Sequence, residues 1–204
     1  MMYQKIIENI IYPMSDKLMG LSIKRDLEKN KQIQWYKTQE LNFLQNKKLY
    51  EILSHCNNNI PYYKKIFHDY SFNINGDIYQ ELGKIPFLTK KIIRNHLPNE
   101  LIDKRRKVYT VEKTSGSSGE QGVFYLDRQA FSKIIASQTL FWEWAGYHFG
   151  KKALQTGINP ERGLKKYLKD QLLLIKYADA FKINEEIIKN TLEPFRKKKN
   201  IHFI

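Results

Sequence analysis

The residues best suited to chemistry lie in one short loop of small residues, Thr114-Ser115-Gly116-Ser117-Ser118-Gly119. In such a loop, successive backbone N–H groups can point inward and hold an anion. Glycine adopts positive φ angles at little cost, and the four hydroxyl groups can donate hydrogen bonds to phosphate oxygens. Lys113 adds a positive charge just before the loop. By its chemistry alone, the stretch is either a phosphate-binding loop or an ordinary flexible turn.

The spacing of the loop excludes two common nucleotide-binding motifs. It lacks the G-x-x-x-x-G-K-[ST] pattern of a Walker A loop, since no lysine follows Gly122. It also lacks the G-x-G-x-x-G spacing of a dinucleotide-binding turn. The loop therefore needs support from the rest of the chain before it predicts a ligand.

Other residues with chemical potential are too scattered to predict a site. His55-Cys56 is the only adjacent pair of soft metal ligands, and a zinc site needs more of them at usable spacings. We interpret Cys56 as a buried residue on a helix face. The other histidines suggest no Ser-His-Asp arrangement. The sequence thus predicts no metal site and leaves the catalytic residues unknown.

Composition limits the class of protein. The chain has 204 residues, of which 42% are hydrophobic, so it can bury one substantial core: one domain or one incomplete larger domain. It contains neither a signal-peptide pattern nor an apolar run near the roughly 20 residues of a transmembrane segment. With a single cysteine, a cytoplasmic protein is the expectation. The net charge of +14 attracts anions in general or simply keeps the surface soluble, and predicts no specific nucleic-acid partner.

The first half of the chain reads as helical. Residues 1–20 carry an apolar stripe at i, i+4 and i+8 that predicts a short amphipathic helix, with Pro13 ending its first part. We expect this stripe to dock on its own domain, with a membrane surface as the lesser alternative. A helix is also predicted over 39–55, a restart at Pro61, and a helix over 90–96 capped by Thr89.

The second half mixes strands and helices around the loop. Residues 108–111 and 123–126 are predicted to be strands that pair as a hairpin-like unit. Asp127 is expected to cap a long helix over 128–149. Residues 164–177 fit a helix or a buried strand, 184–195 a helix, and 201–204 a strand. Because a buried-type strand needs a sheet to join, we expect the chain to be part of something larger.

Three ordered elements together resemble one family. The loop is similar to the [ST]-[SG]-G-[ST]-[ST]-G phosphate loop of adenylate-forming enzymes. Residues 60–64, Ile-Pro-Tyr-Tyr-Lys, and 85–94, Ile-Pro-Phe-Leu-Thr-Lys-Lys-Ile-Ile-Arg, resemble elements that precede this loop in the phenylacetate-CoA ligase family, including its capsular-polysaccharide-biosynthesis (CapK-like) branch. Residues 124–128 also resemble the strand and helix start that follow it. The resemblance covers roughly residues 35–204.

The resemblance implies an incomplete α/β N-terminal domain of an acyl-CoA synthetase-like enzyme. Residues 1–107 would form a helical N-terminal part and 108–204 the start of the ATP-binding core. In the family, ATP with Mg²⁺ activates a carboxylate as its adenylate, and a thiol such as coenzyme A then takes the acyl group. Carried over by position, Thr114, Ser115, Gly116, Ser117, Ser118 and Gly119 would hold the ATP phosphates.

The chain departs from the family pattern in two ways. Glu120 follows the loop where many relatives have Lys-Pro or Thr-Pro, which places a like charge beside the phosphates. The later aromatic-x-x-Thr-Glu motif, ribose-binding aspartate and adenylation lysine do not occur. We therefore expect the 204 residues alone not to form an adenylate, and a separate C-terminal polypeptide is a possible partner. The alternatives are a non-catalytic, basic polyanion-binding protein or a gene remnant.

Overall fold

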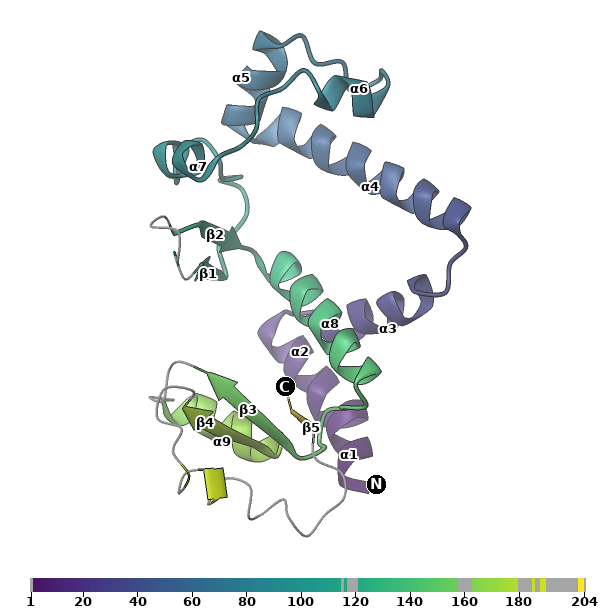
Figure 1. Ribbon diagram of the computed structural model, residues 1–204, viewed down its shortest axis with the longest axis vertical. Helices are drawn as coiled ribbons and strands as arrows, with labels where there is room; N and C mark the ends of the chain where they lie inside the picture. The colour runs from purple at the N-terminus through teal and green to yellow at the C-terminus, as the bar shows by residue number, and fades with distance from the viewer. Residues whose placement is uncertain are drawn as a thin grey trace. The chain divides into compact units, whose positions relative to one another are not determined.

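A computed structural model describes residues 2–114, 116, 121–157, 163–179, 185, 188, 189, 202 and 203. The contacts divide the chain into two units, Gln32–Phe131 and the combination of Met1–Lys31 with Ser132–Ile204. The elements of each unit can be followed by label in Figure 1. The described fold is mixed α/β, with long helices and small sheets. The predicted boundary between 1–107 and 108–204 stays a prediction.

Three consecutive helical segments begin the chain: α1 (Met2–Ile6), a π-helical turn η1 (Ile7–Ile11) and α2 (Tyr12–Met19). In η1, the Tyr12 N–H donates to the Ile7 carbonyl five residues earlier. The expectation that Pro13 ends the first helix is wrong: Pro13 lies in the first turn of α2, where a missing N–H costs little. Gly20 then ends α2 in the left-handed conformation, with φ 66°.

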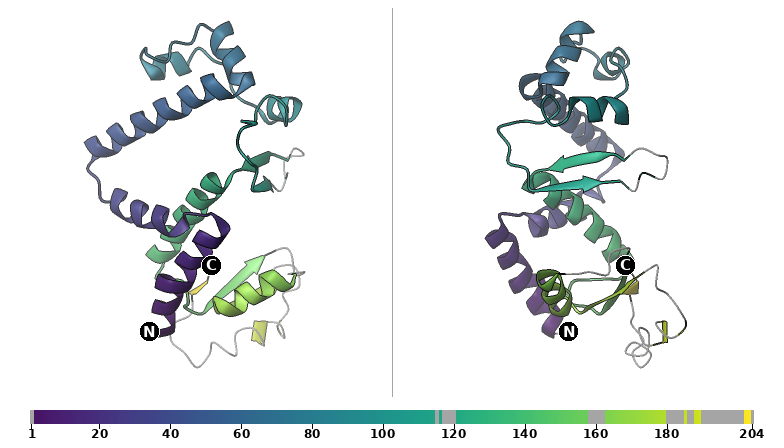
Figure 2. Two further views of the ribbon diagram at one scale, coloured as in Figure 1. Left: turned by 180° about the vertical axis from the view of Figure 1, so that it is seen from behind. Right: turned by 90° about the vertical axis from the view of Figure 1, so that its left-hand side faces the viewer.

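The strands of the same unit form a parallel sheet in the order β4-β3-β5, built from β3 (Ala153–Gly157), β4 (Ile175–Asp179) and β5 (His202–Phe203). Helix α9 (Leu164–Leu172) connects β3 to β4 and lies on one face of the sheet (Figure 2). The ambiguous stretch 164–177 is therefore a helix followed by a strand. The strand predicted near residue 202 does join a sheet.

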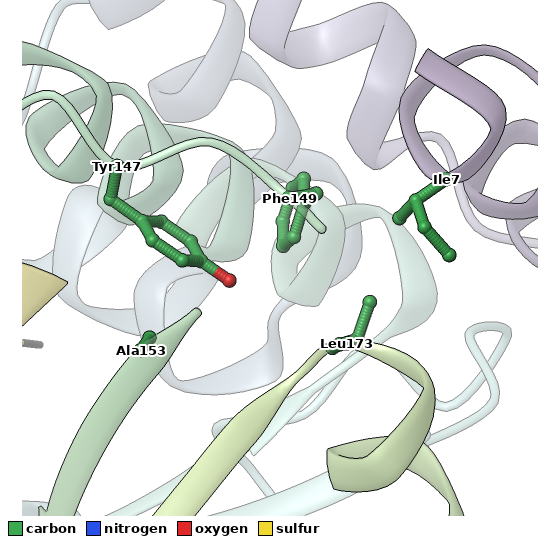
Figure 3. Packing of buried hydrophobic residues seen from close by; sticks show 5 residues of the cluster. All are labelled: Ile7, Tyr147, Phe149, Ala153 and Leu173. Atoms are coloured by element: carbon green, nitrogen blue, oxygen red, sulfur yellow. The ribbon is translucent and has the colours of Figure 1, made fainter. Parts of the chain in front are cut away.

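The core of this unit gathers residues from distant parts of the chain. Ile7, Tyr147, Phe149, Ala153 and Leu173 are all buried and pack together (Figure 3). The ring of Tyr12 stacks on Phe149 with 4.1 Å between ring centroids. The core thus joins the N-terminal helix to the beginning of the sheet.

Two further helices are next to the core segments in the sequence. Helix α3 (Ile23–Ile33) follows α2 and buries Ile23 and Leu27. Helix α8 (Arg128–Trp144) ends five residues before the predicted Phe149. Gly146 follows it with φ 83°, and this turn brings Tyr147 and Phe149 into the core. The earlier end of α8 is therefore required by packing.

The unit Gln32–Phe131 is helical before its hairpin. It contains α4 (Thr38–Asn59), α5 (Pro61–Asp69), α6 (Ile78–Leu82) and α7 (Lys90–His96). Pro61 stands at the first position of α5, as predicted. The predicted Thr89 cap is confirmed, because the Ile92 N–H donates to Thr89 Oγ1 at 3.2 Å. None of the helices in the described part of the chain has the length and apolar character needed to span a bilayer.

The packing of the core predicts that alanine substitutions at two isoleucines one turn apart change the free energy of unfolding by very different amounts. Ile7→Ala should lower the free energy of unfolding by about 2–5 kcal/mol, because it leaves a cavity among buried side chains. Ile10→Ala, at a position 53% exposed, should change it by no more than about 0.5 kcal/mol. Urea denaturation followed by circular dichroism measures both. Equal losses would contradict the packing described.

Candidate functional site

The predicted loop is carried by a two-stranded antiparallel hairpin, β1 (Thr110–Lys113) and β2 (Val123–Leu126). The second strand and the pairing are as predicted, whereas the first strand begins two residues later than expected. The register pairs Thr110 with Leu126 and Lys113 with Val123. The hairpin therefore places the loop beyond the Lys113–Val123 end of the ladder.

A pair of hydrogen bonds closes the neck of the loop. The Thr114 N–H donates to the Gly122 carbonyl at 3.0 Å, and the Gly122 N–H donates to Thr114 Oγ1 at 2.8 Å. Thr114, which was predicted as a phosphate ligand, thus has a structural role at the neck of the loop. Its hydroxyl oxygen accepts a bond, and its O–H remains able to donate one.

Within the loop, the structure explains one glycine. Gly116 has φ +70°, and a Cβ there would lie 2.6 Å from Gln121 Cγ. The backbone conformation favours glycine at this position, and a Cβ would also have to displace the exposed Gln121 side chain. The predicted phosphate ligands Ser115, Ser117, Ser118 and Gly119 lie outside the described residues, as does Glu120.

The base of the hairpin is fixed to the first turn of α8. The Ala130 N–H donates to Asp127 Oδ1 at 2.7 Å, which confirms Asp127 as the cap. Arg106 Nη1 donates to Asp127 Oδ2 at 2.6 Å. The ring of Tyr109 packs against the ring of Phe131, with 5.0 Å between centroids, and the Arg128 guanidinium lies over it at 5.3 Å. These contacts hold the base of the hairpin, where β1 begins and β2 ends.

The adjoining basic segment is organised by Asp103, a residue that was not predicted from the sequence. Asp103 is buried and accepts three hydrogen bonds from Arg105, from its N–H, Nε and Nη2, at 2.9–3.0 Å. Arg106 Nε and His55 Nε2 lie 3.7 and 3.6 Å from Asp103 Oδ2. The signal was present in the sequence, since an aspartate two and three residues before arginines favours such a turn. It was hidden in a basic run that reads as exposed surface.

The electrostatics of this network follow from its contacts. The side-chain hydrogen bonds from Arg105 hold the pKa of Asp103 well below its usual range, against a smaller opposing effect of burial. At Asp127, burial acts to raise the pKa, but the bonds from the Ala130 N–H and from Arg106 outweigh it and the pKa is lowered. Both carboxylates therefore stay ionised and hold the arginines in place.

The remaining candidates show no catalytic arrangement. Cys56 is half-buried, and burial raises the pKa of its thiol. Its neighbour His55 contacts Asp103 and lies 3.1 Å from the Asn59 amide. Over the described residues, no cluster of three or more His, Cys, Asp or Glu side chains could hold a metal ion.

Comparison with known proteins gives one weak similarity. No family model matches the sequence. The chain is similar to Protein CapK of Staphylococcus aureus, with 26% identity over 114 residues, which is 56% of this chain. The match spans only 25% of that protein's length. This similarity is consistent with the CapK-like resemblance.

The Asp103 network predicts a specific effect of pH on stability. A carboxylate with a lowered pKa stabilises the fold when ionised, and this contribution is lost as the pH falls through its folded pKa. Asp103→Asn should therefore reduce stability near neutral pH and flatten the loss of stability between about pH 5 and pH 2. Urea midpoints measured across this range test it.

A second variant tests how much of this pH effect comes from the charge pair between Arg105 and Asp103. Arg105→Gln removes the strongest partner of Asp103 but keeps the carboxylate, so its acid profile should fall between those of the wild type and Asp103→Asn. An Asp103→Asn profile parallel to the wild type would show that Asp103 does not stabilise the fold through its charge.

Proposed function

We propose that this chain is part of an AMP-forming carboxylate–CoA ligase-like protein, and that Thr114–Gly119 holds the phosphates of ATP. The observation that supports this most is the hairpin, which carries a Ser/Gly loop beyond a closed neck between Thr114 and Gly122. The ordered motifs around residues 60–64 and 85–94 and the similarity to Protein CapK add to it.

The described residues suit a phosphate group in three respects. The Thr114 O–H is available to donate, Gly116 adopts the left-handed conformation common in anion-holding nests, and Lys113 is exposed at the end of β1. A bound Mg²⁺ would share the charge of the phosphates. The chain's own residues would orient the phosphates and offset their charge.

The wider activity is also a proposal. We infer a nucleotide and a carboxylate as substrates and coenzyme A as the acceptor, in capsule or cell-surface polysaccharide biosynthesis, all from the resemblance stated above. The family's later motifs do not occur in the 204 residues. Nucleotide binding, and not turnover, is therefore the property to measure on this chain.

The proposal predicts that one methyl group in the loop weakens ATP binding. Gly116→Ala places a Cβ at φ +70° and 2.6 Å from Gln121 Cγ. If ATP requires this conformation, the variant must take up the strain of about 1–2 kcal/mol when it binds, so its affinity for ATP with Mg²⁺, measured by calorimetry, should fall roughly tenfold. The matched control is Gly163→Ala, where a Cβ meets no atom within 4 Å, and it should bind as the wild type does.

The same titrations distinguish the main alternative. A basic polyanion-binding surface would bind ATP, GTP and inorganic polyphosphate alike, would lose them steeply with salt and would ignore Gly116→Ala. That pattern, or the absence of any ATP binding by the wild type, would overturn the proposal.

A further inference from the structure

The first three helical segments leave one apolar row exposed to solvent. Because Ile7 is buried in the core, a second row of apolar residues, spaced four apart along these helices, faces solvent. Exposure along it reaches 66% at Met14 and 90% at Leu18. The members of this row are Met2, Ile6, Ile10, Met14 and Leu18.

A second exposed apolar row lies on α9 of the same unit. Its members are Leu164, Tyr167, Leu168 and Leu172, each at least 41% exposed. The two helices meet, because the Tyr3 hydroxyl donates to the Leu172 carbonyl at 2.6 Å. The row on the first three helical segments, which we call the N-terminal apolar row, is thus linked to the end of α9 at Tyr3.

The acidic and basic side chains of these helices differ in their exposure to solvent. Their three acidic residues are drawn inward: Asp16 and Asp170 are buried, and Glu8 contacts His148 at 3.5 Å. Asp16 also accepts a hydrogen bond from the Lys24 N–H at 2.8 Å. By contrast, Lys5 and Lys17 are exposed. In sequence, α9 adds Lys165, Lys166 and Lys169.

We propose that the N-terminal apolar row adsorbs to an anionic lipid bilayer. Exposed apolar side chains flanked by lysine are the combination that binds at the headgroup boundary, where apolar burial and attraction to anionic lipid act together. A second copy of the chain fits less well, because it would bring two cationic faces together in a protein of net charge +14. This inference is independent of the proposed nucleotide site.

The test is sedimentation of the full chain with vesicles of phosphatidylcholine alone or mixed with phosphatidylglycerol. The wild type should bind the mixed vesicles, bind the neutral ones far less, and dissociate as NaCl is raised. Met14→Glu with Leu18→Glu should weaken binding at least tenfold, because acidic groups replace the inserted side chains. Lys5→Glu with Lys17→Glu should weaken it roughly tenfold.

The matched control is Phe43→Glu with Tyr50→Glu, two changes of the same kind at positions 72% and 46% exposed on α4, which should bind as the wild type does. Circular dichroism checks that each variant is folded. Failure to bind mixed vesicles, or equal loss in Phe43→Glu with Tyr50→Glu, would overturn the proposal. So would a dimer in light scattering that Met14→Glu with Leu18→Glu dissociates, because the surface would then bind protein.

Discussion

The burial of Ile7 against Tyr147, Phe149 and Leu173 determines how the first helices are oriented. A helix can bury only one stripe of its surface in a small core, so the choice of stripe also decides what is left in solvent. Here two adjacent rows were available, because the sequence places isoleucines side by side at positions 6 and 7 and again at 10 and 11. The contacts of Ile7 select one row, and the other becomes the exposed apolar row.

The hairpin depends on different contacts, which join the residues just before β1 to the residues just after β2. Asp127 caps α8 and binds Arg106, while Tyr109 packs on Phe131, so the two strands are fixed where they leave the helix. At the far end, the Thr114–Gly122 pair closes the loop. A loop held at its neck loses less conformational entropy when it binds an anion than a free segment would. This arrangement suits a binding loop and asks little of the rest of the unit.

The sequence allowed prediction of features that depend on a few neighbouring residues. Thr89 and Asp127 as caps, Pro61 at a helix start and Val123–Leu126 as a strand all follow from local hydrogen bonding or backbone preference. Features that depend on distant contacts were missed. The π-helical turn departs from the period of 3.6 on which the helix pattern relies, and Gly146 ends α8 early so that aromatic side chains reach the core.

The site was predicted in the same uneven way. The loop was recognised from composition, and the structure accounts for Thr114 and Gly116, while the phosphate-binding role of Thr114–Gly119 stays a prediction. Asp103 was missed because an aspartate followed by four basic residues looks like solvated surface unless its burial is known. The sequence showed which residues could act chemically, but it did not show which of them are buried.

The burial of acidic side chains also affects which charges a ligand meets at the protein surface. Asp103, Asp16 and Asp170 are buried, so a ligand at the surface does not contact these carboxylates, and it approaches a chain of net charge +14. Such a field draws phosphate groups of any kind, whether from a nucleotide or a lipid. What separates the two proposed sites is the range of the interaction. Main-chain donors in a closed loop act at contact and resist salt, whereas lysines on an open helix surface act over a Debye length of about 8–10 Å and are screened by it. The two sites can therefore share one electrostatic field and still be distinguished by their response to ionic strength.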